Sequence, residues 1–573
     1  MSGFRAFVLL VVLPSLLAAC ATAPGRHPDT GDVAAGQAPR QVSLPGVELK
    51  PEFLYDLLVA DLAVQRKQYV LAIRNYLGVA RRTGDPRVAG MAARVAIYSR
   101  ENALALEAAR LWVSLDGEDP EARQAIIAAY IRNGRPEEAA PHIDALLDME
   151  AGRERGLRLL ASLLSRERDV RAALAVMKQV VDKRRDDPDV LLSYAHLVLR
   201  GGDVTQALAV TEQVLRLRPW WTDALLVKAR LLQLLHRGDE ARALLEQGVR
   251  RHEDDQQLRF AYARLLMEER RYEEALAQYE LLAARSPDNM ELRYTMGLLL
   301  MQLKRYDEAA RTLESIRRRG GRFDDVNFYL GWIAENQGDA DKAIDYYSAV
   351  SRGPNYLDAG IRMAVLKARR GELEQARQLL RRLRSEASAH RQRLYLVEGE
   401  ILREAGRPEE ALAVYTRALQ DAPTDSGLRY ARAIVAEQLD RLDLMEQDLR
   451  DILSREPDNV DALNALGYTL ADRTDRYEEA YGYIKRALEL KPDNNAILDS
   501  MGWVLYRMGN YEEAIKYLRQ SLRLKMDDEV AAHLGEVLWV SGRHQEALQV
   551  WNDALEQFSG NKILLDVIRR FSH

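Results

Sequence analysis

Residues 495–528 read NAILDSMGWVLYRMGNYEEAIKYLRQSLRLKMDD, and this stretch decides the fold. It divides at Gly509 and Asn510 into two amphipathic halves. Each half predicts a helix of about 14 residues, which is about 20 Å long at the usual rise per residue. Gly509 permits the left-handed backbone conformation that ends the first helix. The stretch therefore predicts one helical hairpin.

The same pattern repeats along most of the chain. One small residue, replaced by Met in a single unit, recurs at steps of 33 to 35 residues, which composition alone cannot produce. These anchor positions are Ala72, Ala105, Ala139, Ala173, Ala207, Ala241, Ala275, Ala309, Ala343, Ala376, Ala411, Met445, Ala480, Ala514 and Ala547. A second small residue, Ala or Gly, precedes each anchor by 12 or 13 positions, and Ile127 is the exception.

Small residues at these two positions let two helix backbones approach closely. Several units close with Pro, which blocks continuation of the second helix. A single helix pair cannot bury its apolar face, so neighbouring pairs are expected to stack into a solenoid. Residues 51–562 are predicted to form about 15 such pairs, or 10 to 12 by stricter criteria, with 563–573 as a capping segment.

Gly502, Gly509, Tyr511, Ala514 and Ser521 occupy the small and aromatic positions of a known repeat. On these residues the unit resembles the tetratricopeptide repeat. The resemblance implies an all-α fold, a right-handed superhelix of helix-turn-helix repeats. A fold of this kind does not by itself specify a function.

The first 20 residues, MSGFRAFVLLVVLPSLLAAC, have the order of a secretory signal, with Arg5 before a short apolar core and small residues after it. Leu17-Ala18-Ala19-Cys20 resembles the bacterial lipobox. The resemblance implies that residues 1–19 are a lipoprotein signal peptide and that Cys20 is lipidated. A plain signal peptide or a buried apolar helix are the alternatives. Two or more acyl chains would anchor the protein stably in a membrane.

Residue 21 is Ala, whereas an Asp there commonly marks retention in the inner membrane of such lipoproteins. Its absence implies export to the outer membrane. Residues 21–50 contain four Pro and four Gly without apolar periodicity, so residues 20–50 are interpreted as the lipidated Cys and a disordered tether. A flexible coil of this length has an end-to-end distance of roughly 30 Å.

Composition excludes several function classes. Lys and Arg total 82 and Asp and Glu total 87, so the net charge of −5 gives no reason to expect nucleic-acid binding. The single Cys rules out intrachain disulfides and thiolate-cluster metal sites. No phosphate-binding loop, nucleophile elbow or zinc-protease motif occurs, and no two of the nine His lie three or four residues apart. We predict no catalytic residue, no metal site and no cofactor, although a hydrolase with an unrecognised site stays open.

Two kinds of charged segment, the paired carboxylates and one basic run, are interpreted as parts of the fold rather than as binding sites. Paired carboxylates such as Glu273-Glu274 and Glu512-Glu513 recur just before the anchor, where they complement the helix dipole. The basic run Arg317–Arg322 is interpreted as a solvated turn between units, with an acidic or membrane contact as the alternative.

Aromatic residues occupy the positions that line the concave side of such a solenoid. When the Gly of each unit is counted as position 8, positions 5, 9, 12 and 13 are the concave ones. They hold Trp332, Tyr468, Trp503, Tyr506 and Trp539. Exposed Trp and Tyr are typical of a protein-binding hot spot, whereas rings packed against adjacent units are the alternative. The hypothesis is that Trp503, Tyr506 and Trp539 together contact a protein partner.

Three C-terminal stretches, 461–480, 496–514 and 531–548, resemble a smaller group within this repeat family. With the lipobox, they look like outer-membrane tetratricopeptide-repeat lipoproteins of Gram-negative bacteria, which face the periplasm. One type in that group binds a periplasmic carboxyl-terminal processing protease and delivers peptidoglycan hydrolases to it. The resemblance therefore implies a non-enzymatic adaptor. The alternatives are a lipoprotein that regulates peptidoglycan synthesis and one that supports envelope polysaccharide export.

Overall fold

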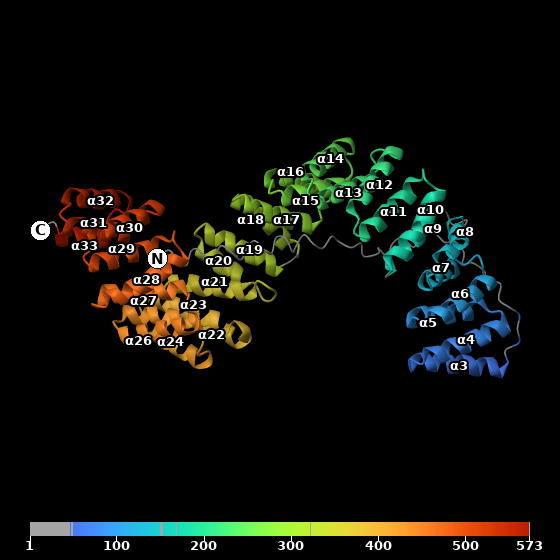
Figure 1. The fold of residues 1–573 in the computed structure, drawn as a ribbon, viewed down its shortest axis with the longest axis horizontal. Coiled ribbons are helices and arrows are strands. Elements are labelled where there is room, and N and C mark those ends of the chain that lie inside the picture. Colours follow the sequence, from blue (N-terminus) through green and yellow to red (C-terminus); the bar gives the residue numbers. More distant parts are fainter. Residues whose placement is uncertain are drawn as a thin grey trace. The chain divides into compact units, whose positions relative to one another are not determined.

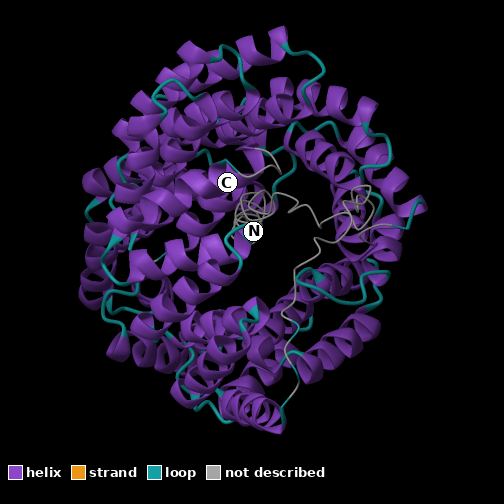
Figure 2. Ribbon diagram, turned by 90° about the vertical axis from the view of Figure 1, so that its right-hand side faces the viewer, coloured by secondary structure: helices purple, strands orange, loops and turns teal. Residues whose placement is uncertain are grey.

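The computed structural model describes residues 46, 48 and 50–571, apart from residues 149–152, 168 and 321–322. The described residues form helices joined by short loops, and none of them forms a strand (Figure 2). The chain divides into two compact units, one ending at Leu265 and the other beginning at Leu266. No helix in the described ranges is both long enough and apolar enough to cross a bilayer.

The first unit consists of consecutive helices that Figure 1 labels in order. They are α3 (Pro51–Gln65), α4 (Tyr69–Thr83), α5 (Pro86–Ser99), α6 (Asn102–Leu115), α7 (Pro120–Arg132), the short 3₁₀ helix η1 (Pro136–Ala139), α8 (Ala140–Leu147), α9 (Arg153–Arg166), α10 (Val170–Lys183), α11 (Pro188–Arg200), α12 (Val204–Leu217), α13 (Thr222–Leu234) and α14 (Gly238–Arg251). The boundary between the units falls within α15 (Gln256–Glu268).

The second unit continues the same succession of helices. They are α16 (Tyr272–Arg285), α17 (Met290–Gln302), α18 (Tyr306–Arg318), α19 (Phe323–Asn336), α20 (Ala340–Ser348), α21 (Tyr356–Arg369), α22 (Leu373–Glu386), the 3₁₀ helix η2 (Ser388–His390), α23 (Arg391–Glu404), α24 (Pro408–Asp421), α25 (Ser426–Gln438), α26 (Leu442–Arg455), α27 (Val460–Arg473), α28 (Tyr477–Leu490), α29 (Asn495–Arg507), α30 (Tyr511–Leu524), α31 (Asp528–Val540), α32 (His544–Gln557) and α33 (Lys562–Phe571).

Helices pack as hairpins, and hairpins pack on their neighbours. In the second unit α29 packs on α30, and α27, α29 and α31 pack side by side as the first helices of three successive hairpins. All anchor positions of the repeat are at most 2% exposed. The prediction of an all-α solenoid of stacked helical hairpins is therefore confirmed.

The small residue of the first helix is required by close packing. A Cβ added at Gly502 would lie 2.5 Å from Cγ of Leu518 on the paired helix, and one at Gly467 would lie 2.5 Å from Cγ1 of Ile484. Both distances are too short for real atoms. Any larger side chain at these positions would push the two helices of the hairpin apart.

Asp or Asn side chains cap several of the first helices. Asn494, for example, accepts hydrogen bonds from the backbone N–H groups of Ala496 and Ile497 at 3.0 and 3.2 Å. Such caps satisfy backbone donors that the first turn of a helix leaves free. Gly509 ends α29 with φ of 81°, as the sequence predicts.

One hairpin departs from the predicted pattern. Residues Glu137 and Glu138 lie in the 3₁₀ helix η1 rather than in the first turn of an α-helix, and α8 behind it is only 8 residues long. Pro136 and Pro141 explain the break, because neither can donate the backbone hydrogen bond of a regular helix. The pairs Glu273-Glu274 and Glu512-Glu513 lie in first turns of second helices, as predicted.

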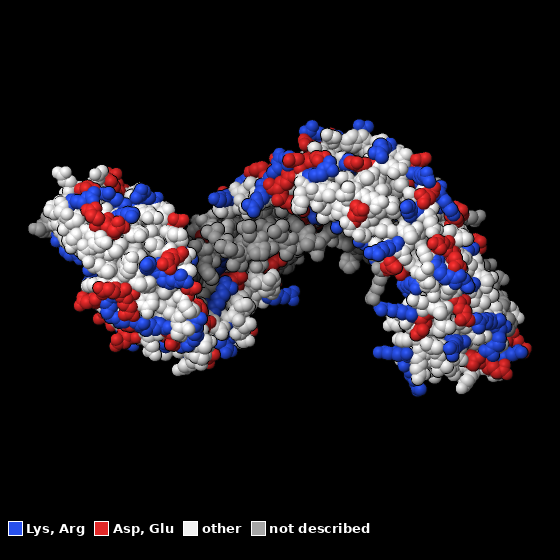
Figure 3. All heavy atoms as spheres, in the orientation of Figure 1, with Lys and Arg blue, Asp and Glu red and all other residues white. Residues whose placement is uncertain are grey.

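Arg and Glu form a recurring ion pair where the second helices begin. An Arg just before the helix binds a Glu three residues later, in Arg237–Glu240, Arg271–Glu274, Arg305–Glu308, Arg407–Glu410, Arg476–Glu479 and Arg543–Glu546. Figure 3 shows basic and acidic side chains interspersed over the visible surface of each unit. Each exposed pair contributes little to stability, because water and salt screen the attraction between its charges.

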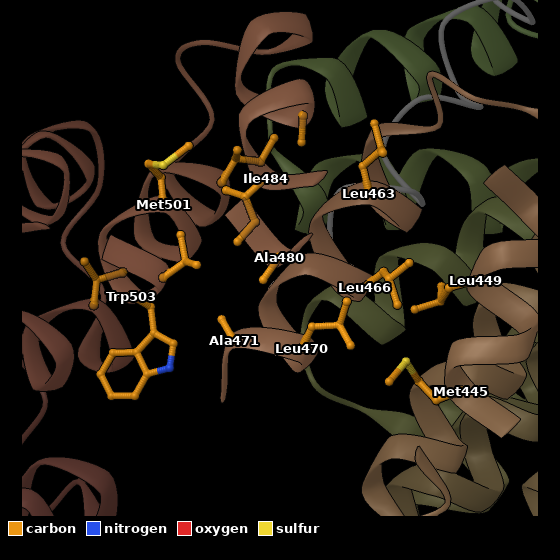
Figure 4. Close-up of a cluster of buried hydrophobic side chains, with 14 of the residues drawn as sticks. Met445, Leu449, Leu463, Leu466, Leu470, Ala471, Ala480, Ile484, Met501 and Trp503 are labelled. Atoms are coloured by element: carbon orange, nitrogen blue, oxygen red, sulfur yellow. The ribbon is translucent and has the colours of Figure 1, made fainter. Parts of the chain in front are cut away.

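The core of the second unit runs through its C-terminal hairpins. Buried side chains from α26 to α31 form one continuous cluster, which includes Met445, Leu466, Ile484, Met501 and Trp503 (Figure 4). Because this cluster crosses from hairpin to hairpin, the first helices α27, α29 and α31 are held in fixed register. Their outward side chains therefore form one shared surface.

Candidate functional site

A buried ion pair joins two successive hairpins. Nδ1 of His533, on α31, lies 3.0 Å from Oδ1 of Asp499, on α29. The imidazole also stacks on the indole of Trp503, with ring centroids 4.2 Å apart. The side chains of His533 and Asp499 are only 12% and 10% exposed. His533 of α31 and Asp499 of α29 thus hold each other's side chains in place.

Trp503 is part of this intramolecular network. The residue is 7% exposed, and its Nε1 donates a hydrogen bond to Oδ1 of Asp472, on α27, at 3.1 Å. Of the two alternatives for this position, Trp503 has the ring packed against adjacent units. Position 9 lies between two neighbouring first helices, so Asp472 on one side and His533 on the other cover the indole.

Tyr506 lies beside Trp503, and Tyr468 lies beside His533. The hydroxyl of Tyr506 donates to Oε1 of Glu536 at 3.1 Å, and Glu536 is also ion-paired with Arg570 of α33. Burial and the Glu536 carboxylate raise the pKa of Tyr506 to about 12. The ring of Tyr468 lies 6.3 Å from that of His533 and is partly exposed.

The two remaining aromatic candidates lie elsewhere. Trp539 is partly exposed and stacks on His544 of α32, with ring centroids 4.4 Å apart. Trp332, on α19, meets Tyr306 of α18 edge to face at 5.7 Å. Ring contacts thus join Tyr468, Trp503 and Tyr506 directly or through His533, whereas Trp539 and Trp332 contact rings of α32 and α18. Cys20 lies outside the described residues.

We call the surface of α27, α29 and α31 the acidic aromatic face. It consists of Tyr468, Asp472, Asp499, Trp503, Tyr506, Glu529, His533 and Glu536. The carboxylates and the His of this face cannot be found from pairs of His within one helix, because Asp499 and His533 lie on different helices. The relevant signal was the repeat itself, since Asp499 and His533 are 34 residues apart.

Two polar groups of this face have no partner among the described residues. The hydroxyl of Tyr468 and the carboxylate of Glu529 make neither a hydrogen bond nor an ion pair there. No group of three or more His, Cys, Asp or Glu in the described part of the chain is arranged to hold a metal ion. The chemistry that this face offers is therefore hydrogen bonding and charge attraction toward a ligand.

The acidic aromatic face makes stability depend on pH. Burial lowers the pKa of His533, but the Asp499, Glu529 and Glu536 carboxylates outweigh burial and raise that pKa above its ordinary value. Burial likewise raises the pKa of Glu529, helped by Asp499 and by two Asp at the start of α31. Both groups bind protons more tightly in the folded chain. The contribution of His533 is complete below the ordinary His pKa of about 6.5 and is lost as pH rises through the raised value.

We therefore expect the urea midpoint of the full chain to be lower at about pH 9 than at about pH 6. His533→Gln should reduce this difference, because it removes the titrating group. His544→Gln is the matched control, since that imidazole is exposed and has no carboxylate partner among the described residues. The same pH dependence in the wild-type chain and in His533→Gln would contradict the assignment.

Comparison with known proteins identifies the repeat. Matches to the tetratricopeptide repeat cover residues 158–220, 199–265, 266–325, 336–396, 399–430, 458–527 and 500–562. The chain is also 37% identical over 543 residues to the TPR repeat-containing protein PA4667 of Pseudomonas aeruginosa. The alignment covers 93% of this chain and 91% of that protein.

Solved structures of similar proteins match parts of the chain. The thermophilic TPR protein TTC0263 of Thermus thermophilus is 26% identical and covers 31% of this chain and 95% of its own, with a TM-score of 0.28. A tetratricopeptide repeat protein of Parabacteroides merdae is 16% identical and covers 44% of this chain and 100% of its own, with a TM-score of 0.36. On its repeat matches and its nearly full-length relative, the chain belongs to the tetratricopeptide-repeat family.

Proposed function

We propose that this chain is a non-enzymatic scaffold, lipid-anchored to the outer membrane and facing the periplasm. In this proposal it binds a carboxyl-terminal processing protease together with peptidoglycan hydrolases and so promotes their proteolysis. Tetratricopeptide repeats imply a scaffold for protein–protein interaction. The protease, the hydrolases and the anchor are supported by the resemblance of the N-terminal and C-terminal stretches described above.

The observation that carries the scaffold role is the continuous surface of successive first helices. The acidic aromatic face is built by three hairpins, and within the described chain the hydroxyl of Tyr468 and the carboxylate of Glu529 stay unbonded. A rigid surface of this kind can hold a partner without performing chemistry on it. When two partners are tethered together, their effective concentration reaches roughly the millimolar range.

The alternative functions are regulation of peptidoglycan synthesis and support of envelope polysaccharide export. They rest on the same fold and the same N-terminal motif, and they differ only in the partner. A hydrolase activity of the chain itself is a third alternative, which lacks a recognised motif.

A reconstituted proteolysis assay tests the proposal. Purified protease is incubated with a peptidoglycan hydrolase, with and without the mature chain, and loss of the intact hydrolase is followed over time. We expect the chain to accelerate proteolysis, because it holds enzyme and substrate together. No acceleration would favour the synthesis or export alternatives, and turnover of muropeptides by the chain alone would show that it is an enzyme. Mass spectrometry of the mature N-terminus tests the anchor, since a lipidated Cys20 is expected there.

A further inference from the structure

Carboxylates of four successive hairpins act electrostatically on one hydroxyl. Glu437, Asp472, Asp499 and Glu529 come from α25, α27, α29 and α31, and all four act on Tyr468. Burial and these carboxylates raise the pKa of Tyr468, so its hydroxyl keeps its proton. The hydroxyl makes no hydrogen bond within the described residues. A neutral, unbonded hydroxyl therefore lies within electrostatic reach of four carboxylates.

Three of the four carboxylates have a cation nearby in the chain. Arg473 lies 3.4 Å from Glu437, Arg507 lies 3.9 Å from Asp472, and His533 lies 3.0 Å from Asp499, measured between nitrogen and oxygen atoms. These three cations belong to the packing between hairpins.

Glu529 differs from the other three carboxylates. It has no ion pair within the described chain, and its side chain reaches solvent at the start of α31. Asp499, Asp527 and Asp528 act on it, and so does His533, which is already bound to Asp499. Partial burial and the neighbouring acids raise the pKa of Glu529, so its charged form is under-stabilised in the chain as it stands. An external cation would supply the missing partner.

We propose that the acidic aromatic face binds a basic segment of a partner protein and seats a Lys or Arg side chain against Tyr468 and Glu529. Charge complementarity selects the cation, because Glu529 is the one of these four carboxylates without an ion pair in the described chain. The tyrosine ring and the unpaired carboxylate together suit a side chain that combines an apolar stem with a charged, hydrogen-bonding end.

This inference deepens the scaffold function and rests on it, since it assigns one class of partner to one surface. It can fail while the scaffold function stands, because the proteolysis assay does not depend on where the partner binds. Equally, binding of a basic segment here would not by itself make the partner a protease substrate.

The test measures the binding of two labelled peptides to the full-length mature chain by fluorescence anisotropy. One peptide is a short, unstructured sequence of Lys, Arg, Ser and Ala, and the other carries Glu and Asp in place of Lys and Arg. We expect the basic peptide to bind and the acidic one not to bind. Glu529→Lys should weaken binding of the basic peptide at least about tenfold, since it turns the unmatched charge into a repelling one. Tyr468→Phe should weaken it about threefold through loss of one hydrogen bond.

Glu556→Lys is the matched control. Glu556 is an exposed carboxylate of α32, on the second helix of its hairpin, so the variant changes the net charge equally without touching the acidic aromatic face. We expect it to change affinity less than about twofold. Circular dichroism of each variant shows whether its helices are intact. If Glu529→Lys does not fold, Tyr468→Phe still tests the inference, because it preserves the packing of the ring. Equal binding by Glu529→Lys and Glu556→Lys, equal binding of both peptides, or no binding of the basic peptide would overturn the inference.

Discussion

Asp448→Ala is expected to lower the free energy of unfolding by about 3–5 kcal/mol. Asp448, on α26, is 0% exposed. Its carboxylate binds Arg432 of α25 through two hydrogen bonds of 2.7 Å and Arg429 through one of 3.1 Å. The side chains of Arg429 and Arg432 are only 13% and 14% exposed. Truncation of the acid leaves two guanidinium groups poorly solvated and without their main partner, and that penalty dominates the loss.

Urea unfolding of the full chain, followed by circular dichroism, measures this effect. Asp451→Ala is the matched control, because Asp451 binds the same Arg429 at 2.7 Å but is 40% exposed. Its loss should cost no more than about 1 kcal/mol, as expected for a solvent-accessible pair. If both variants unfold at the same urea concentration, burial does not set the strength of this network.

Gly535→Ala is expected to destabilise the chain by about 1–3 kcal/mol, although Ala is the better helix former. A Cβ at this position would overlap Nε1 of Trp551 and lie 2.5 Å from Cδ1 of the same indole, which is fully buried. The indole would have to move, and its 3.4 Å hydrogen bond to the backbone oxygen of Ala532 would be lost. The shift of the thermal midpoint measures the cost.

Gly482→Ala provides the control of opposite sign. Gly482 lies in α28, is exposed, and would bring its Cβ within 4 Å of nothing outside its own helix. Only the helix propensity changes there, so we expect a gain of about 0.5–1 kcal/mol. If both substitutions destabilise the chain, or if neither does, the close approach of the Trp551 indole is not the reason that position 535 must be Gly.

The acidic aromatic face could be predicted from the sequence only in part. Tyr468, Trp503 and Tyr506 occupy concave positions of neighbouring repeats, so the repeat alignment places them on one side of the solenoid. Their exposure could not be predicted, because it depends on which side chains the next hairpin places over them. His533 covers Trp503, whereas nothing in the described chain binds the hydroxyl of Tyr468.

The sequence by itself determined the repeat, the helical hairpins and the positions that must be small, because these follow from local periodicity and from close packing within each unit. Only the tertiary structure decided which charges are matched. Asp499 meets His533 across one repeat, and Asp448 binds two Arg of the preceding helix. Glu529 has no partner among the residues that the structure describes. The reason is that periodicity fixes which side of a helix a residue lies on, whereas burial and charge pairing depend on side chains contributed by neighbouring helices.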